Sequence, residues 1–215
     1  MPNWCSNILT IKSTKEIIAE LQNDLKVAEA TKDENGFYTK GLLETLAPIP
    51  DYVEEDWYRL HNDYWGTKWD VPFTQCYFVY NDNPPSISVA FDSAWGPPTG
   101  ACKALLEKLV DRDPEVQVKC VFEEAGMNFI GYWVDGDLDE RTIDGLYKGL
   151  IEDDADAIEF AAECGTCLET LAECYFCTQD DDCRCAICDP ENPIKGYQQP
   201  ELEIEGESVE EGDKE

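Results

Sequence analysis

Seven cysteines lie within 25 residues near the C-terminal end of the chain. They are Cys164, Cys167, Cys174, Cys177, Cys183, Cys185 and Cys188. Six of them form three CxxC pairs, and a CxxC turn can present two thiolates to one tetrahedral metal ion. Because four thiolates complete a structural zinc site, the spacing predicts that this segment binds one or two structural zinc ions.

One zinc ion needs two of the three CxxC pairs, so three combinations of pairs are possible. We favour Cys174 and Cys177 with Cys185 and Cys188, because the seven residues between these pairs make a compact loop. Cys164 and Cys167 could replace either pair. A second ion would need a bridging thiolate, an aspartate or a distant ligand. The alternatives to zinc are an iron centre, disulfides, or a redox-sensitive segment without a stable site, although the usual iron–sulfur spacings are absent.

A second group of residues suggests a ligand pocket in the N-terminal half. Trp65 and Trp69 are four residues apart, so within a helical turn both rings would lie on one face. Such rings can stack on a base or on a peptide ring. The candidate pocket residues are Trp65, Lys68, Trp69, Asp70 and Trp95. The alternative, which we favour, is that these bulky rings belong to the hydrophobic core.

No catalytic residue is predicted. His61 is the only histidine, and no nucleophile motif accompanies it. The sequence also lacks GxGxxG, Walker, HExxH and GxSxG motifs. We therefore expect a protein that is not an enzyme.

Three segments resemble a known family. These are the Pro2-Asn3-Trp4-Cys5 start that runs to Ile11, the stretch from Trp65 to Asp70, and the stretch from Phe91 to Pro98; residues 46–50 are also similar. The family is that of the uncharacterised YubB-like proteins of bacteriophages and conjugative plasmids. The resemblance covers about residues 1–134. It implies a ferredoxin-like domain and an origin in a mobile element, and it brings no established activity.

Hydrophobic periodicity predicts the elements that position these residues. Strands are expected at 7–11, 76–80, 87–91, 116–122 and 129–134, helices at 17–28, 52–62 and 97–110, and an extended or turning segment at 41–50. This order is that of an α+β protein with a ferredoxin-like antiparallel sheet and helices on one face.

A C-terminal extension follows this domain. Asp137-Leu138-Asp139-Glu140 resembles a capping box, which predicts that a helix begins there, and another helix is expected at 156–164. We expect three parts: a ferredoxin-like domain at 1–134, an acidic, helical and Cys-rich zinc-binding extension at 135–199, and a disordered acidic tail at 200–215.

The chain is strongly acidic, with 47 Asp and Glu against 16 Lys and Arg and a formal net charge of −31. Residues 1–134 contribute −10 and residues 135–215 contribute −21. This charge disfavours direct binding to nucleic acid and to anionic membranes. We expect a basic host protein as the partner, including nucleic-acid-binding proteins. The expected partner-binding residues are Glu152, Asp153, Asp154, Asp156, Asp180, Asp181 and Asp182.

These observations predict a non-enzymatic accessory protein of a phage or mobile element. Its acidic surface would imitate nucleic acid and inhibit a host defence or nucleic-acid-processing protein. The alternatives are an acidity that serves only solubility, and a ligand-binding or enzymatic domain with a Trp-lined pocket near Trp65, Trp69 and Trp95. With no signal peptide and no apolar run long enough to span a bilayer, the host bacterial cytoplasm is the expected compartment.

Overall fold

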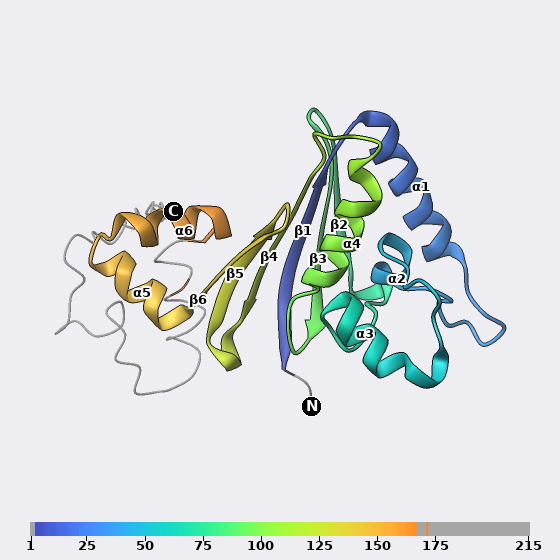
Figure 1. Ribbon diagram of the computed structural model, residues 1–215, viewed down its shortest axis with the longest axis horizontal. Helices are drawn as coiled ribbons and strands as arrows, with labels where there is room; N and C mark the ends of the chain where they lie inside the picture. The colour runs from blue at the N-terminus through green and yellow to red at the C-terminus, as the bar shows by residue number, and fades with distance from the viewer. Residues whose placement is uncertain (1–2, 167–170, 172–215) are drawn as a thin grey trace, which may run out of the picture.

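A computed structural model describes residues 3–166 and residue 171, which form one six-stranded antiparallel sheet flanked by helices (Figure 1). The strands are β1 (Trp4–Lys12), β2 (Tyr77–Asp82), β3 (Pro85–Ala94), β4 (Gln117–Glu124), β5 (Phe129–Val134) and β6 (Asp137–Thr142). Their order across the sheet is β2-β3-β1-β4-β5-β6, and all neighbours are antiparallel. The predicted α+β class and antiparallel sheet are confirmed.

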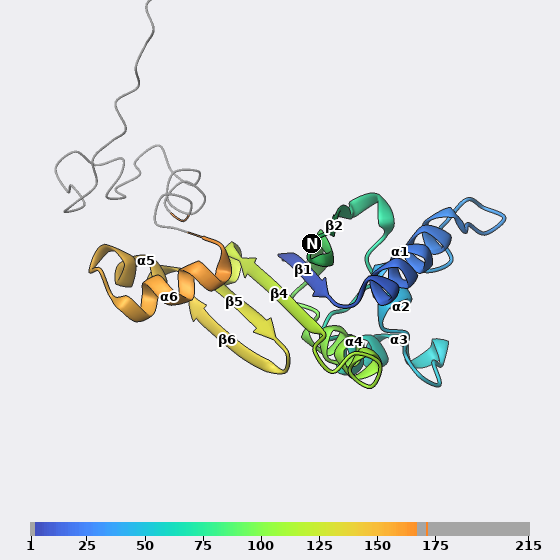
Figure 2. The same ribbon diagram turned by 90° about the horizontal axis from the view of Figure 1, so that it is seen from above.

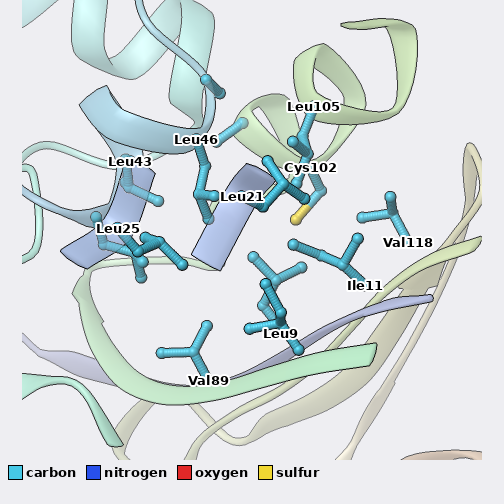
Figure 3. Packing of buried hydrophobic residues seen from close by; sticks show 14 of the residues in the cluster. Leu9, Ile11, Leu21, Leu25, Leu43, Leu46, Val89, Cys102, Leu105 and Val118 are labelled. Atoms are coloured by element: carbon cyan, nitrogen blue, oxygen red, sulfur yellow. The ribbon is translucent and has the colours of Figure 1, made fainter. Parts of the chain in front are cut away.

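Four helices cover one face of this sheet: α1 (Lys15–Ala30), α2 (Leu42–Leu46), α3 (Trp57–Trp65) and α4 (Thr99–Val110). The predicted helix at 17–28 is the amphipathic α1, whose buried residues recur at helical spacing from Ile17 to Ala28. Figure 3 shows the resulting core, in which Leu9, Ile11, Val89 and Val118 of the sheet meet Leu21 and Leu25 of α1, Leu43 and Leu46 of α2, and Leu105 of α4.

Two further helices, α5 (Ile143–Ile151) and α6 (Ala155–Cys164), lie on the opposite face, beside β5 and β6 (Figure 2). Ile130 and Trp133 are three residues apart on β5, so their side chains point to opposite faces. Ile130 belongs to the core under α5 and α6, whereas Trp133 belongs to the core under α1 and α4. The prediction of helices on one face therefore holds for α1 to α4, and β5 contributes to two separate cores.

The prediction that a helix begins at Asp137 is wrong, because residues 137–142 form β6. Asp135 and Gly136 have φ angles of 49° and 112° and make a tight turn that pairs Val134 with Asp137. An Asp-Gly dipeptide between two strands favours such a hairpin. The next helix, α5, begins after Thr142, whose hydroxyl accepts a hydrogen bond from the Gly145 amide.

The predicted parts of the chain beyond Thr166 lie outside the described residues, apart from Leu171. This applies to most of the Cys-rich segment and to the acidic tail at 200–215. Leu171 is buried in the core formed by α5 and α6. No helix in residues 3–166 is both long enough and apolar enough to cross a membrane.

Candidate acidic surface and ligand cavity

Three segments with distinctive sequences, at 3–11, 65–70 and 91–98, meet at one end of the sheet. The Thr67 hydroxyl donates to the Ala94 carbonyl at 2.9 Å and accepts from the Ala94 amide at 3.1 Å. The Trp95 amide donates to the Asn3 carbonyl at 3.0 Å. These bonds join segments that are far apart in the sequence, so the motif residues that form them have a structural role.

A buried amide completes this junction. Asn7, which is 3 % exposed, donates to the Cys5 carbonyl at 2.7 Å, to the Ser93 hydroxyl at 2.8 Å and to the Phe91 carbonyl at 3.3 Å. A buried polar group is costly without hydrogen-bond partners, and these contacts satisfy Asn7. It therefore stabilises the pairing of β1 with β3.

The structure does not bring the five predicted pocket residues together. Helix α3 ends at Trp65, because Gly66 follows it with a left-handed φ of 84°. Trp65 is 1 % exposed and donates its indole N–H to the Ala47 carbonyl at 2.8 Å. Trp69 lies beyond the end of the helix, so it does not share a helix face with Trp65.

Two of the predicted residues, Lys68 and Trp69, instead belong to an exposed aromatic patch with Trp4, and Trp95 is also exposed. Trp69 packs against Trp4 with ring centroids 6.1 Å apart, and the Lys68 ammonium lies 4.5 Å from the Trp69 ring centroid. Trp95, joined to Asn3 through its backbone, is 50 % exposed. Aromatic rings exposed in this way can make contacts with another molecule.

Asp70 has a structural role at the start of α2. Its carboxylate accepts backbone amide hydrogen bonds from Gly41 at 2.7 Å, Leu43 at 2.8 Å and Val71 at 2.8 Å. Burial raises the pKa of Asp70, and these amide hydrogen bonds oppose that shift. The carboxylate therefore satisfies amides that the first turn of a helix leaves without partners.

Trp65 and Asp70 also line a cavity of about 500 Å³ between α2, α3 and the segments around them. The other lining residues include Tyr38, Lys40, Glu44, Tyr52 and His61. The sequence did not identify Glu44 or Tyr52 as site residues, because neither belongs to a motif and only the folded chain brings them to His61. Within the cavity, the Nδ1 atom of His61 lies 2.9 Å from the Lys68 carbonyl.

The acidic residues of the described stretch 135–166 lie on β6, α5, α6 and the turns that join them. Residues 135–166 contain 11 acidic and 2 basic residues. Of the expected partner-binding residues, Asp156 pairs with Arg141 at 2.9 Å, and Glu152 lies 3.9 Å from Lys148. Asp154 caps α6 by accepting from the Asp156 amide, and Asp153 is exposed in the turn between α5 and α6. Asp180, Asp181 and Asp182 lie outside the described residues.

Cys164 is the only member of the cysteine cluster that the structure describes. It is 8 % exposed and belongs to the core beneath α6, and burial raises the pKa of its thiol to about 12. The other six, Cys167, Cys174, Cys177, Cys183, Cys185 and Cys188, lie beyond this part of the chain. Within the described residues, no three His, Cys, Asp or Glu side chains are grouped so that they could hold a metal ion.

The described residues thus offer two candidate sites, an acidic surface on β6, α5 and α6 and a cavity beside His61. Both are built from side chains that the fold brings together from separate elements. Comparisons of the chain with protein-family models, with curated proteins and with solved structures gave no match.

Proposed function

We propose that this chain is a non-enzymatic accessory protein of a phage or mobile element that binds and inhibits a basic host protein in the bacterial cytoplasm. The acidic surface of β6, α5 and α6 would occupy a face that the partner uses for nucleic acid. The observation that carries this proposal is the excess of unpaired carboxylates: seven of the 11 acidic residues at 135–166 make no ion pair with another described residue.

Three of these unpaired carboxylates are exposed, lie on the α5 and α6 side of the sheet, and make no hydrogen bond to another described residue through their side chains. They are Asp137, Asp153 and Glu159. Glu140 is also exposed and unpaired, but it pairs with Gly131 and so points to the other face of β6. Exposed carboxylates of one sign raise the local concentration of a cationic partner and speed its association. The same charge repels nucleic acid itself, so the proposed partner is a protein.

We further propose a ferredoxin-like core of the YubB-like kind. Its support is the strand order β2-β3-β1-β4 together with the positions of α1 and α4 in the chain, each of which follows one strand and precedes another. Strands β5 and β6 would then extend this core and carry the acidic surface.

The third part of the proposal is a structural zinc site in the Cys-rich segment. Its support is the spacing of the CxxC pairs. Cys164 is buried in an apolar core, but six other thiols remain, among them the favoured pairs Cys174 with Cys177 and Cys185 with Cys188. Native mass spectrometry of the full chain tests it. The expected mass exceeds that of the bare chain by one or two zinc ions, and a chelator removes the excess. A mass equal to the bare chain would refute the site.

The partner is tested by capture from a bacterial lysate on the immobilised full chain. We expect a basic nucleic-acid-binding protein to be retained at low salt and released by high salt or by a short DNA duplex. A variant that combines Asp137→Asn, Asp153→Asn and Glu159→Gln should lose this retention.

The matched control neutralises three exposed carboxylates away from the acidic surface. It combines Asp24→Asn, Glu29→Gln and Glu34→Gln, and so changes the net charge by the same amount. It should retain the partner like the unmodified chain. Equal loss in both variants would mean that net charge alone matters, and retention of no basic protein at low salt would leave the proposal without support.

A further inference from the structure

The cavity beside His61 has a wall of stacked aromatic rings. The His61 ring lies 4.3 Å from the Trp65 ring centroid and 5.8 Å from the Tyr52 ring centroid, at interplanar angles of 33° and 28°. Trp65 is buried, whereas Tyr52 is 43 % exposed and has ring surface free to meet a ligand. A wall of this kind favours a flat, polarisable group that can stack on it.

Three of the polar side chains that line this cavity, those of Glu44, Asp70 and His61, can accept hydrogen bonds. The half-buried Glu44 makes no ion pair with any described residue. Burial raises its pKa, and the Ile49 amide and the nearby charge of Lys40 partly oppose this shift. Asp70 adds a second carboxylate, whose partners are backbone amides.

His61 adds a further acceptor. The Lys68 carbonyl 2.9 Å from its Nδ1 atom can only accept, so the hydrogen is on Nδ1. In the neutral ring the Nε2 atom is then left as an acceptor. Lys40, on the rim, is exposed and makes no ion pair with Glu44. The cavity therefore combines unneutralised acceptors with an aromatic wall.

We infer that this cavity binds a guanidinium group, supplied either by a small guanidino compound or by an arginine side chain of another protein. A guanidinium is planar and cationic, so it can stack on the exposed Tyr52 ring while donating two parallel hydrogen bonds to the Glu44 carboxylate. An ammonium group lacks the flat face. A volume of about 500 Å³ is in the range of small-molecule sites. This inference is independent of the acidic surface.

The test compares arginine amide with citrulline amide, which has nearly the same shape but a neutral urea group. Binding to the full chain is followed by isothermal titration calorimetry and by tryptophan fluorescence. We expect saturable binding of arginine amide and at least roughly tenfold weaker binding of citrulline amide, because hydrogen bonds to charged groups contribute more than neutral ones. No saturable binding, or equal binding of both, would overturn the inference.

Variants locate the site and identify the source of the group. Glu44→Gln should weaken arginine amide binding on the order of tenfold, whereas Glu55→Gln, an exposed neighbour outside the cavity, should leave it unchanged. If Glu44→Gln fails to fold, Tyr52→Ala provides the second variant. Unchanged binding in a folded Glu44→Gln or Tyr52→Ala protein would also overturn the site.

Two further probes distinguish the sources. Tighter binding of agmatine would indicate a small guanidino compound, and tighter binding of an acetylated Gly-Arg-Gly amide would indicate an arginine side chain. The variant that neutralises the acidic surface should bind arginine amide normally. Failure of the cavity and failure of the proposed partner binding are therefore separate results.

Discussion

Single buried polar residues hold the N-terminal strand and the segments around Thr67 and Ala94 together. Asn7 donates to three acceptors on β1 and β3, and Thr67 both donates to and accepts from Ala94. Such residues resemble binding residues when only the sequence is known, because they are polar and lie in distinctive motifs. Their burial and their saturated hydrogen bonds identify them as structural.

Asn7→Ala should destabilise the protein. The substitution leaves the Cys5 carbonyl and the Ser93 hydroxyl without this donor, and the expected loss in the free energy of unfolding is about 1–3 kcal/mol. Urea unfolding measures it. Asn23→Ala, at an exposed position on α1, serves as the control and should change the stability by less than about 0.5 kcal/mol. Equal effects of both substitutions would contradict the structural role of Asn7.

Cys5 should make stability depend on alkaline pH. Burial raises the pKa of its thiol from 9.0 to about 12. Because the folded pKa is the higher one, the contribution of the protonated thiol is fully present below pH 9.0 and is lost as the pH rises towards 12. The difference in unfolding free energy between the unmodified chain and Cys5→Ala should therefore be constant below pH 9.0 and shrink above it. A constant difference throughout would contradict the raised pKa.

At the scale of elements, the periodic segments were predictable and the short ones were not. The strands β1 to β5 and the helices α1 and α4 follow from hydrophobic periodicity and strand propensity. Residues 137–142 match a helix start and a strand equally well, and only pairing with β5 decides between them. The cavity could not be predicted, because Glu44, Tyr52 and His61 come from separate elements with no shared motif.

The contact between α3 and α4 depends on a glycine. A Cβ atom at Gly100 would lie 2.3 Å from the Tyr64 carbonyl oxygen and 3.0 Å from the Trp65 carbonyl carbon. Gly100→Ala should therefore destabilise the protein by about 1–3 kcal/mol, although alanine favours a helix by about 1 kcal/mol. Gly96→Ala is the control, because a Cβ there meets nothing within 4 Å. Thermal and urea unfolding would show the contrast, and an unchanged or increased stability of Gly100→Ala would refute the close contact.

At the scale of the whole molecule, net charge opposes folding. A chain of −31 repels itself in the compact state, and salt screens this repulsion. We expect the Tm to rise when monovalent salt is increased, and to rise less in the variant that neutralises Asp137, Asp153 and Glu159. Scanning calorimetry at several salt concentrations measures both effects. A Tm that falls with salt would mean that attractive ion pairs outweigh the repulsion.

The charges of β6 have one more consequence, for the behaviour of two copies of the chain. In the described sheet, β6 and β2 are the edge strands, whose unpaired backbone groups could accept a further strand. Carboxylates at Asp137, Asp139 and Glu140 would repel one another if two β6 strands met. On β2, Tyr77 and Val79 are uncharged and 72 % and 42 % exposed. If copies of the chain associate through sheet edges, this charge pattern should favour β2 over β6.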